Sequence, residues 1–140
     1  MSSFVKQSDV RQEGFDWGTI GWRLTPDKGS KHLVIMDVTL EPGEGHDFHR
    51  HPGQEEMIIV KQGEITQYVE RESTSLGAGD SVYLDEGVIH ASFNDGAATA
   101  HLQVVIGRRH VVEQHHCAVA RGEELFQRQD LAPVTQRAAR

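Results

Sequence analysis

Short runs rich in Val, Ile, Tyr and Phe alternate with glycine-containing breaks along the chain, and before residue 110 a helical spacing of apolar residues is hard to find. Short runs that recur at this interval predict an all-β domain, a sandwich or a small barrel. The expected strands cover residues 18–24, 33–40, 46–51, 56–61, 64–70, 81–84, 90–94 and 101–106. The sequence Asn94-Asp95-Gly96 favours a tight reversal, so we expect the last two strands to form a hairpin.

The size and charge of the chain restrict its class. A chain of 140 residues can form one domain but not two of ordinary size. Its formal net charge of −7 repels phosphate backbones and anionic lipid surfaces, so we expect no nucleic-acid or membrane partner. The N-terminus lacks an apolar signal segment, and the single Cys117 cannot close an intrachain disulfide. These features together predict a cytoplasmic protein.

The placement of the histidines indicates a metal site. His49 and His51 are two residues apart on an expected strand, so both imidazoles point to the same face. An isolated pair of this kind is more often a solvent-exposed strand edge than a metal site. Glu56 follows the turn at Pro52-Gly53, and a hairpin there would add its carboxylate to the two imidazoles. Glu55 competes with Glu56 for this role.

Glycines flank this group at fixed intervals, and a second set of residues follows. The first set is Gly43, His49, His51, Glu56 and Gly63, which resembles the first cupin motif in every fixed position and spacing. The second set is Gly79, Gly87, His90 and Asn94, which resembles the second cupin motif. The fifteen residues between Gly63 and Gly79 are a short gap, as in small bacterial members. Cupins usually have Pro at the position of Asp85, so the turn there lacks that constraint but no ligand is lost.

The resemblance implies a fold, a cofactor and ligands. The fold is a double-stranded β-helix, a jelly-roll barrel, over residues 18–108, with flanking segments at residues 1–17 and 109–140. The ligands are His49, His51, Glu56 and His90, which would bind one divalent transition metal per chain. Three imidazoles and one carboxylate suit Mn, Fe, Co, Ni, Cu or Zn better than Mg or Ca. The six residues between Glu56 and Gly63 favour Glu56 over Glu55, which then points out of the barrel.

The other histidines are expected outside the site. His46 lies three residues before His49, which places it on the opposite, exposed face of a regular strand. If the alternate residues Leu102, Val104 and Ile106 fill the barrel, His101 and Gln103 point outward. With the reverse parity these two would be polar groups of the pocket. His115-His116-Cys117 has no further ligand at a useful spacing, and we interpret it as part of a terminal segment.

Aromatic residues could line a substrate pocket, although in small barrels they more often belong to the core. These residues are Trp17, Trp22, Phe48, Tyr68, Tyr83 and Phe93. The resemblance implies a metal-dependent enzyme that acts on a small molecule in the barrel, of dioxygenase, isomerase or lyase type. The alternative is a non-catalytic cupin that binds a metal or small ligand for sensing or storage. The sequence identifies no catalytic acid or base.

The terminal regions contain more apolar residues than a small barrel needs to close. The set is Phe4, Val5, Phe15, Trp17, Ile20, Trp22, Val111, Val112, Leu125 and Phe126. Apolar surface outside a filled barrel favours a partner, so we expect a homodimer in which terminal strands pack on the neighbouring sheet. In the alternative these residues cover their own barrel and the protein is a monomer. The Gln/Arg/Ala-rich residues 127–140 have little to bury and are expected to be frayed or packed on a neighbouring subunit.

Overall fold

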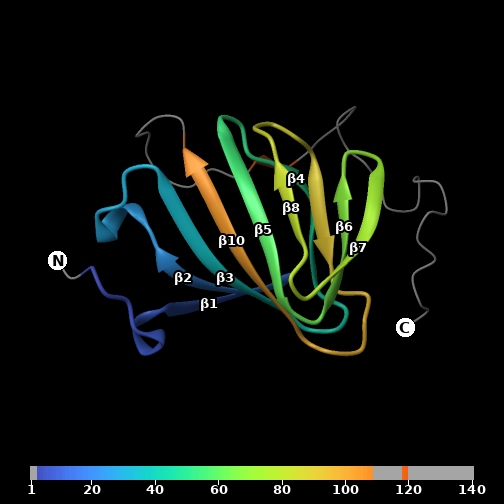
Figure 1. Cartoon of the computed structure of the whole chain (residues 1–140), viewed down its shortest axis with the longest axis horizontal. Helices are drawn as coiled ribbons and strands as arrows, with labels where there is room; N and C mark the ends of the chain where they lie inside the picture. Colours follow the sequence, from blue (N-terminus) through green and yellow to red (C-terminus); the bar gives the residue numbers. More distant parts are fainter. Residues whose placement is uncertain (1–2, 109–117, 120–140) are drawn as a thin grey trace.

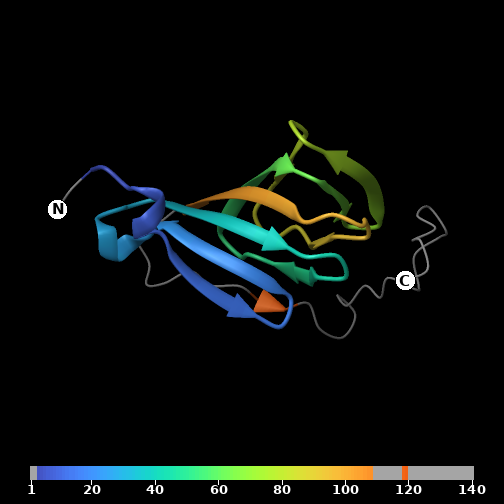
Figure 2. The same ribbon diagram turned by 90° about the horizontal axis from the view of Figure 1, so that it is seen from below.

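The structure is a computed structural model that describes residues 3–108 and 118–119. Two antiparallel sheets make up this part of the chain. The strands are β1 (Arg11–Phe15), β2 (Gly18–Leu24), β3 (Leu33–Leu40), β4 (Gly45–Arg50), β5 (Gln54–Gln62), β6 (Glu64–Val69), β7 (Glu72–Gly77), β8 (Ser81–Leu84), β9 (His90–Phe93), β10 (Ala100–Arg108) and β11 (Ala118–Val119). The six-stranded sheet has the order β1-β2-β3-β10-β5-β8, and the five-stranded sheet has the order β11-β4-β9-β6-β7. The two sheets fold over one another (Figures 1 and 2). The all-β prediction is confirmed.

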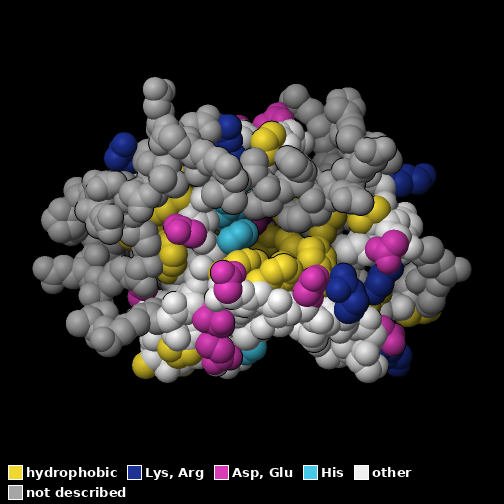
Figure 3. Space-filling model, turned by 180° about the vertical axis from the view of Figure 1, so that it is seen from behind, with side chains coloured by type: hydrophobic (Ala, Val, Ile, Leu, Met, Phe, Trp, Pro, Cys, Tyr) yellow, Lys and Arg dark blue, Asp and Glu magenta, His cyan; other side chains and the backbone are white. Residues whose placement is uncertain are grey.

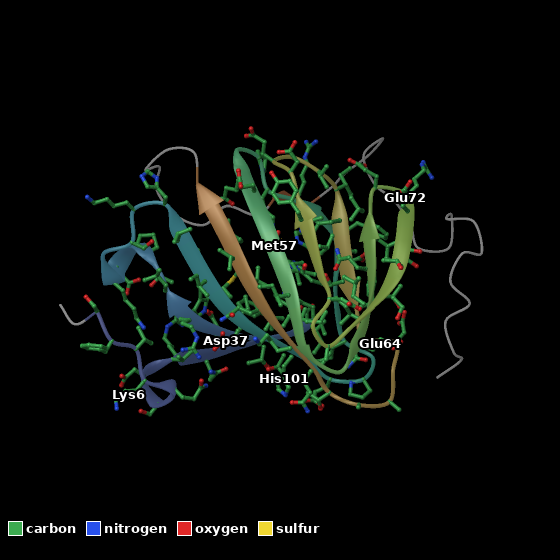
Figure 4. All side chains as sticks on the ribbon, in the orientation of Figure 1. Lys6, Asp37, Met57, Glu64, Glu72 and His101 are labelled. Carbon is green, nitrogen blue, oxygen red and sulfur yellow. The ribbon has the colours of Figure 1, made fainter. Side chains whose placement is uncertain are left out.

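Alternation along the strands decides which side chains fill the interior. On β3 and β10 every second residue is buried, and the inward positions include Met36, Val38, Leu102 and Val104. His101 lies on the outer face, where its Nδ1 is 3.3 Å from the hydroxyl of Thr39 on the neighbouring strand. Figure 4 labels His101 on this face together with Asp37 and Met57. The expected outward orientation of His101 and Gln103 is therefore confirmed.

The expected hairpin at Asn94-Asp95-Gly96 is wrong. β9 belongs to the five-stranded sheet and β10 to the six-stranded sheet, so the turn crosses between the sheets. The Asn94 amide donates to the carbonyls of Leu40 (2.7 Å) and Ala98 (2.8 Å), and its oxygen accepts from the amide of Gly96 (3.0 Å). This buried side chain thus binds three backbone groups and holds the connection from one sheet to the other.

Three strands, β1, β7 and the two-residue β11, were not among those expected from the sequence. β1 and β7 contain no buried side chain, so neither has the alternation of buried and exposed residues that reveals a half-buried strand. β1 is ordered by five paired positions on β2, and β7 by six on β6. The pairing with β2 and β6 therefore defines these two strands, and in β7 Leu76 also packs against the core.

Part of the terminal apolar set packs inside the barrel of its own chain. Ile20 is a buried core residue, and Trp17 and Trp22 are half-buried and pack against the core, so these three contribute much less to an outer apolar surface than the sequence suggests. Phe4 and Phe15 remain 85% and 39% exposed. Val111, Val112, Leu125 and Phe126 lie outside the described residues, as do His115-His116-Cys117 and residues 127–140. In residues 3–108 and 118–119 no helix has the length and apolar character of a membrane span.

Candidate metal centre

Four buried side chains from three places in the chain meet inside the barrel. His49 lies on β4, His51 directly after it, Glu56 on β5 and His90 at the start of β9. Their exposed fractions lie between 2% and 6%. One nitrogen or oxygen of each lies within 4.8 Å of those of the other three. The four residues could therefore hold one metal ion.

The route by which Glu56 reaches the histidines differs from the expected one. β4 and β5 belong to different sheets, so residues 51–53 cross between the sheets and form no hairpin. Gly53 has a φ of +72°, and the amide of Gln54 donates to the carbonyl of His51 at 3.2 Å. Glu56 then meets the imidazoles across the interior, because facing sheets bring inward side chains together. The predicted proximity is confirmed, and the predicted hairpin is wrong.

Backbone carbonyls orient two of the imidazoles. Nδ1 of His49 lies 2.6 Å from the carbonyl of Asp47, and Nδ1 of His90 lies 3.0 Å from the carbonyl of Val88. A carbonyl can only accept, so each Nδ1 carries the hydrogen and each Nε2 carries a lone pair. Hydrogen bonds of this kind fix the tautomer of metal-binding histidines in proteins. Both rings are therefore prepared to bind a cation through Nε2.

The carboxylate of Glu56 lies between two imidazoles. Its Oε2 is 3.1 Å from Nε2 of His51 and 3.0 Å from Nε2 of His90. Glu56 Oε2 and His90 Nε2 are fully buried and make no hydrogen bond within the described residues. Burying the Nε2 lone pair of His90 against the carboxylate of Glu56 costs free energy unless a third group interacts favourably with both. A divalent cation is such a group, so the donor set fits the metal that the sequence predicts.

Burial sets the protonation state of His49. Burial, followed by the charges that His46, His90 and His51 can carry, lowers the pKa of His49 well below its ordinary value. Burial acts to raise the pKa of the Glu56 carboxyl, and the contacts of its carboxylate with the imidazoles of His51 and His90 act in the opposite direction. Together these contacts lower the pKa of Glu56 below its ordinary range. Neutral His49 and ionised Glu56 are the forms that bind metals.

His46 is inside the cavity, so its expected exposed position is wrong. The register between β4 and β9 shifts between His46 and His49, and this irregularity puts both rings on the inner face. The His46 ring stacks on Trp17 (4.1 Å between centroids) and on His49 (3.7 Å). A bulge has no clear sequence signal, which explains why alternation placed His46 outside.

A small cavity of about 50 Å³ adjoins the four residues. Apart from the candidate ligands, its polar lining residues are His46 and Ser92, and most of the rest is aliphatic. The apolar lining residues are Trp17, Ile20, Met36, Val38, Leu40, Ile58, Leu102, Val104 and Ile106. Figure 3 shows histidine beside apolar side chains in a hollow on this side of the molecule. The cavity can take one end of a small molecule, with its polar groups directed to one wall.

The aromatic residues divide between core, cavity and surface. Phe48, Tyr68 and Phe93 form a second buried cluster, with edge-on ring contacts of 5.3–6.2 Å. Tyr83 is 55% exposed. Among the six aromatic candidates, Trp17 lines the cavity, and its position in the chain gave no signal for this.

At Asp85, where cupins usually have proline, hydrogen bonds hold the turn. The Asp85 carboxylate accepts from the amide of Glu86 at 2.8 Å, and its carbonyl accepts from Val88 at 3.2 Å. The amide of Gly87 donates to the carbonyl of His51 at 3.1 Å. This turn is therefore held by hydrogen bonds within it and by a hydrogen bond to the backbone of His51, a candidate ligand.

Glu56, rather than Glu55, faces the histidines. Glu56 is buried and Glu55 is exposed, as their alternation on β5 requires. We predict that Glu56→Ala lowers the affinity for a divalent metal by at least about 10-fold, whereas Glu55→Ala changes it by less than about 2-fold. Competition against a chromophoric chelator measures both affinities. A larger loss in Glu55→Ala would contradict the assignment.

The lowered pKa of His49 predicts a loss of stability in acid. In the metal-free protein the unfolded chain takes up a proton near pH 6.5, while folded His49 stays neutral, so acid favours unfolding. We expect the free energy of unfolding to fall between about pH 7 and pH 5, by at most about 1.4 kcal/mol per pH unit from this group. Urea titrations of chelator-treated protein at the two pH values measure the change. His49→Asn should reduce it, and an unchanged pH dependence in that variant would contradict this explanation.

The fold and site define a class of protein: a small β-barrel with a buried histidine–carboxylate group beside an apolar cavity. The family described as Cupin domain matches residues 36–107, just over half of the 140 residues. The chain belongs to this family, and its barrel is the double-stranded β-helix that the motifs predict.

Solved structures share this fold at low sequence identity. Polyketide cyclase RemF from Streptomyces resistomycificus is 18% identical, with a TM-score of 0.71 over 89% of each chain. A predicted oxalate decarboxylase from Thermotoga maritima is 21% identical, with a TM-score of 0.69 over 75% of this chain and 98% of its own. A sugar phosphate isomerase from Silicibacter pomeroyi is 20% identical, with a TM-score of 0.65 over 75% of each chain. Among curated proteins, none matches the sequence. These similarities establish the fold alone.

Proposed function

We propose that this protein is a metal-dependent enzyme that acts on a small molecule in the barrel, by a dioxygenase, isomerase or lyase reaction. The observation that carries the proposal is the position of the candidate ligands His49, His51, Glu56 and His90, which form one wall of a cavity. Structural metal sites are usually closed by protein ligands on all sides, whereas catalytic sites keep positions for substrate. A bound transition metal supplies Lewis-acid or redox chemistry at such positions.

The protein's own residues restrict the substrate. Aliphatic side chains such as Met36, Val38 and Leu102 make most of the cavity wall apolar and offer no charge to a substrate. The substrate's polar groups would therefore lie against the wall formed by the four candidate ligands and against the neighbouring His46 and Ser92. Structural neighbours as different as a polyketide cyclase and a sugar phosphate isomerase indicate that the barrel accommodates several reactions, so the reaction depends on these side chains.

A panel of diketones, catechols and keto acids tests the proposal. Iron-loaded protein is incubated with each compound in an oxygen electrode, and the same mixtures are followed by NMR without oxygen. We expect at least one compound to be consumed or rearranged, and His51→Ala to lose this activity. Compounds that bind and remain unchanged under both conditions would instead support the non-catalytic alternative, a cupin that senses or stores its ligand.

We also propose that the protein is a homodimer with one metal per barrel. The support is apolar surface at the N-terminus, where Phe4 is 85% exposed and Phe15 39%. Light scattering at micromolar concentration should give a mass near twice 15.6 kDa. A mass near 15.6 kDa would contradict the dimer.

A further inference from the structure

Two polar side chains outside the candidate ligand group lie beside it on the same two strands. On β4 and β9, His49 pairs with His90, and His46 pairs with Ser92. Both His46 and Ser92 line the cavity. Ser92 follows His90 by two residues on a strand, so the same inward face presents both side chains. His46 and Ser92 thus give the cavity a second polar region next to the candidate ligands.

The hydrogen-bonding direction at Ser92 is fixed by a buried glutamine. Gln67 Nε2 donates to the carbonyl of Tyr68 at 3.1 Å, so the amide oxygen of Gln67 faces Ser92. That oxygen can only accept, and Ser92 Oγ donates its hydrogen to it at 2.6 Å. Gln67 is 1% exposed and Ser92 5%, so solvent does not compete for these contacts. A hydroxyl has one hydrogen, and Ser92 therefore offers only lone pairs to a molecule in the cavity.

The neighbouring His46 ring limits the space at this position. Its faces are covered by Trp17 and His49, at centroid distances of 4.1 and 3.7 Å, so the ring is held in one orientation. Apart from the candidate ligands, His46 and Ser92, the lining of the cavity is apolar. A polar group of a bound molecule that extends beyond the candidate ligands would be desolvated there, and Ser92 could accept a hydrogen bond from it.

We propose that Ser92 is a specificity-determining residue, which accepts a hydrogen bond from a hydroxyl or amine of a ligand whose other polar groups bind the metal. The substrate class is then small hydroxylated or amino-substituted compounds that also carry a metal-chelating group. This inference rests on the proposed function and narrows its substrate. A site built to bind a hydroxyl discriminates against the analogue that lacks it, because the buried partner is left unpaired.

Glycerate and lactate are the probes that test this role. Both chelate a metal through the carboxylate and the 2-hydroxyl group, and glycerate has one additional hydroxyl. Calorimetric titration of the Co(II)-loaded protein should show that glycerate binds about 5-fold more tightly than lactate, the size of one net hydrogen bond. Ser92→Ala should remove this preference while the metal content and the affinity for lactate stay the same. Ser81→Ala, at an exposed residue of β8, is the matched control and should keep the preference.

Ser92→Cys is a second variant in case alanine disturbs the buried pair. It fills the same space with a weak hydrogen-bonding sulfur and should also lose the preference. Equal affinities in the wild-type protein, a preference that survives in both variants, or no binding of either acid would overturn the role of Ser92. The titration does not depend on turnover. A preference without catalysis would therefore contradict only the proposed enzyme, and catalysis without a preference would contradict only Ser92.

Discussion

Replacing His51 by alanine is expected to lower the affinity for a divalent transition metal at least about 100-fold, because a direct ligand should matter at least as much as the residues that orient ligands. Nε2 of His51 lies 3.1 Å from Glu56 Oε2 in the buried group, so alanine would remove one of four donors and leave the others incomplete. The loss is measured by competition with a chelator of known affinity. Circular dichroism of the metal-free variant checks that it is folded.

His101→Ala is the matched control for this experiment. His101 is a histidine of the same barrel, but it lies on the outer face of β10 beside Thr39. Its replacement should leave metal binding within about 2-fold of the wild-type value, because surface changes away from a site are nearly neutral. Full metal affinity in His51→Ala would remove His51 from the ligand set.

Gly63→Ala is expected to destabilise the fold by at least about 3 kcal/mol, because two costs combine at this residue. Its φ of +79° disfavours a side chain, and a Cβ would lie 2.6 Å from the carbonyl oxygen of Thr99 and 2.9 Å from Cα of Ala100. Both neighbours are backbone atoms, so relief requires the chain to move. Thermal unfolding should show a midpoint lower by about 10 °C.

Two other glycines separate the two costs. Gly79 has a φ of +93° but open space around its Cβ position, so Gly79→Ala should cost about 1 kcal/mol from backbone conformation alone. Gly14 has neither a positive φ nor a neighbour within 4 Å, and its replacement should change stability little. Equal losses at Gly63 and Gly79 would show that the contact with Thr99 and Ala100 costs nothing.

The sequence predicted most strands because their side chains alternate between a filled interior and an outer face. β2, β3 and β8 begin and end at the expected residues. β1 and β7 were not predicted because none of their side chains is buried, so the alternation that marks a half-buried strand is missing. The crossing at Asn94 was missed because the sequence of a polar turn is similar whether the turn joins two paired strands or connects two sheets.

The candidate ligands were predictable because their spacing and alternation are local properties of the chain. Glu56 was placed correctly by its parity on β5, although the route proposed for it was wrong. His46 was missed because a single irregularity between β4 and β9 reverses the parity of one residue. The cavity position of Ser92 follows from its parity with His90, but its fixed hydrogen-bonding direction depends on Gln67, which is far away in sequence.

Crystals of the metal-saturated protein, measured at the absorption edge of the bound metal, test the central claim most directly. We predict one anomalous peak per chain inside the barrel, about 2.0–2.2 Å from Nε2 of His49, His51 and His90 and from a carboxylate oxygen of Glu56. A peak at other residues, or no peak in this group of a saturated crystal, would contradict the assignment.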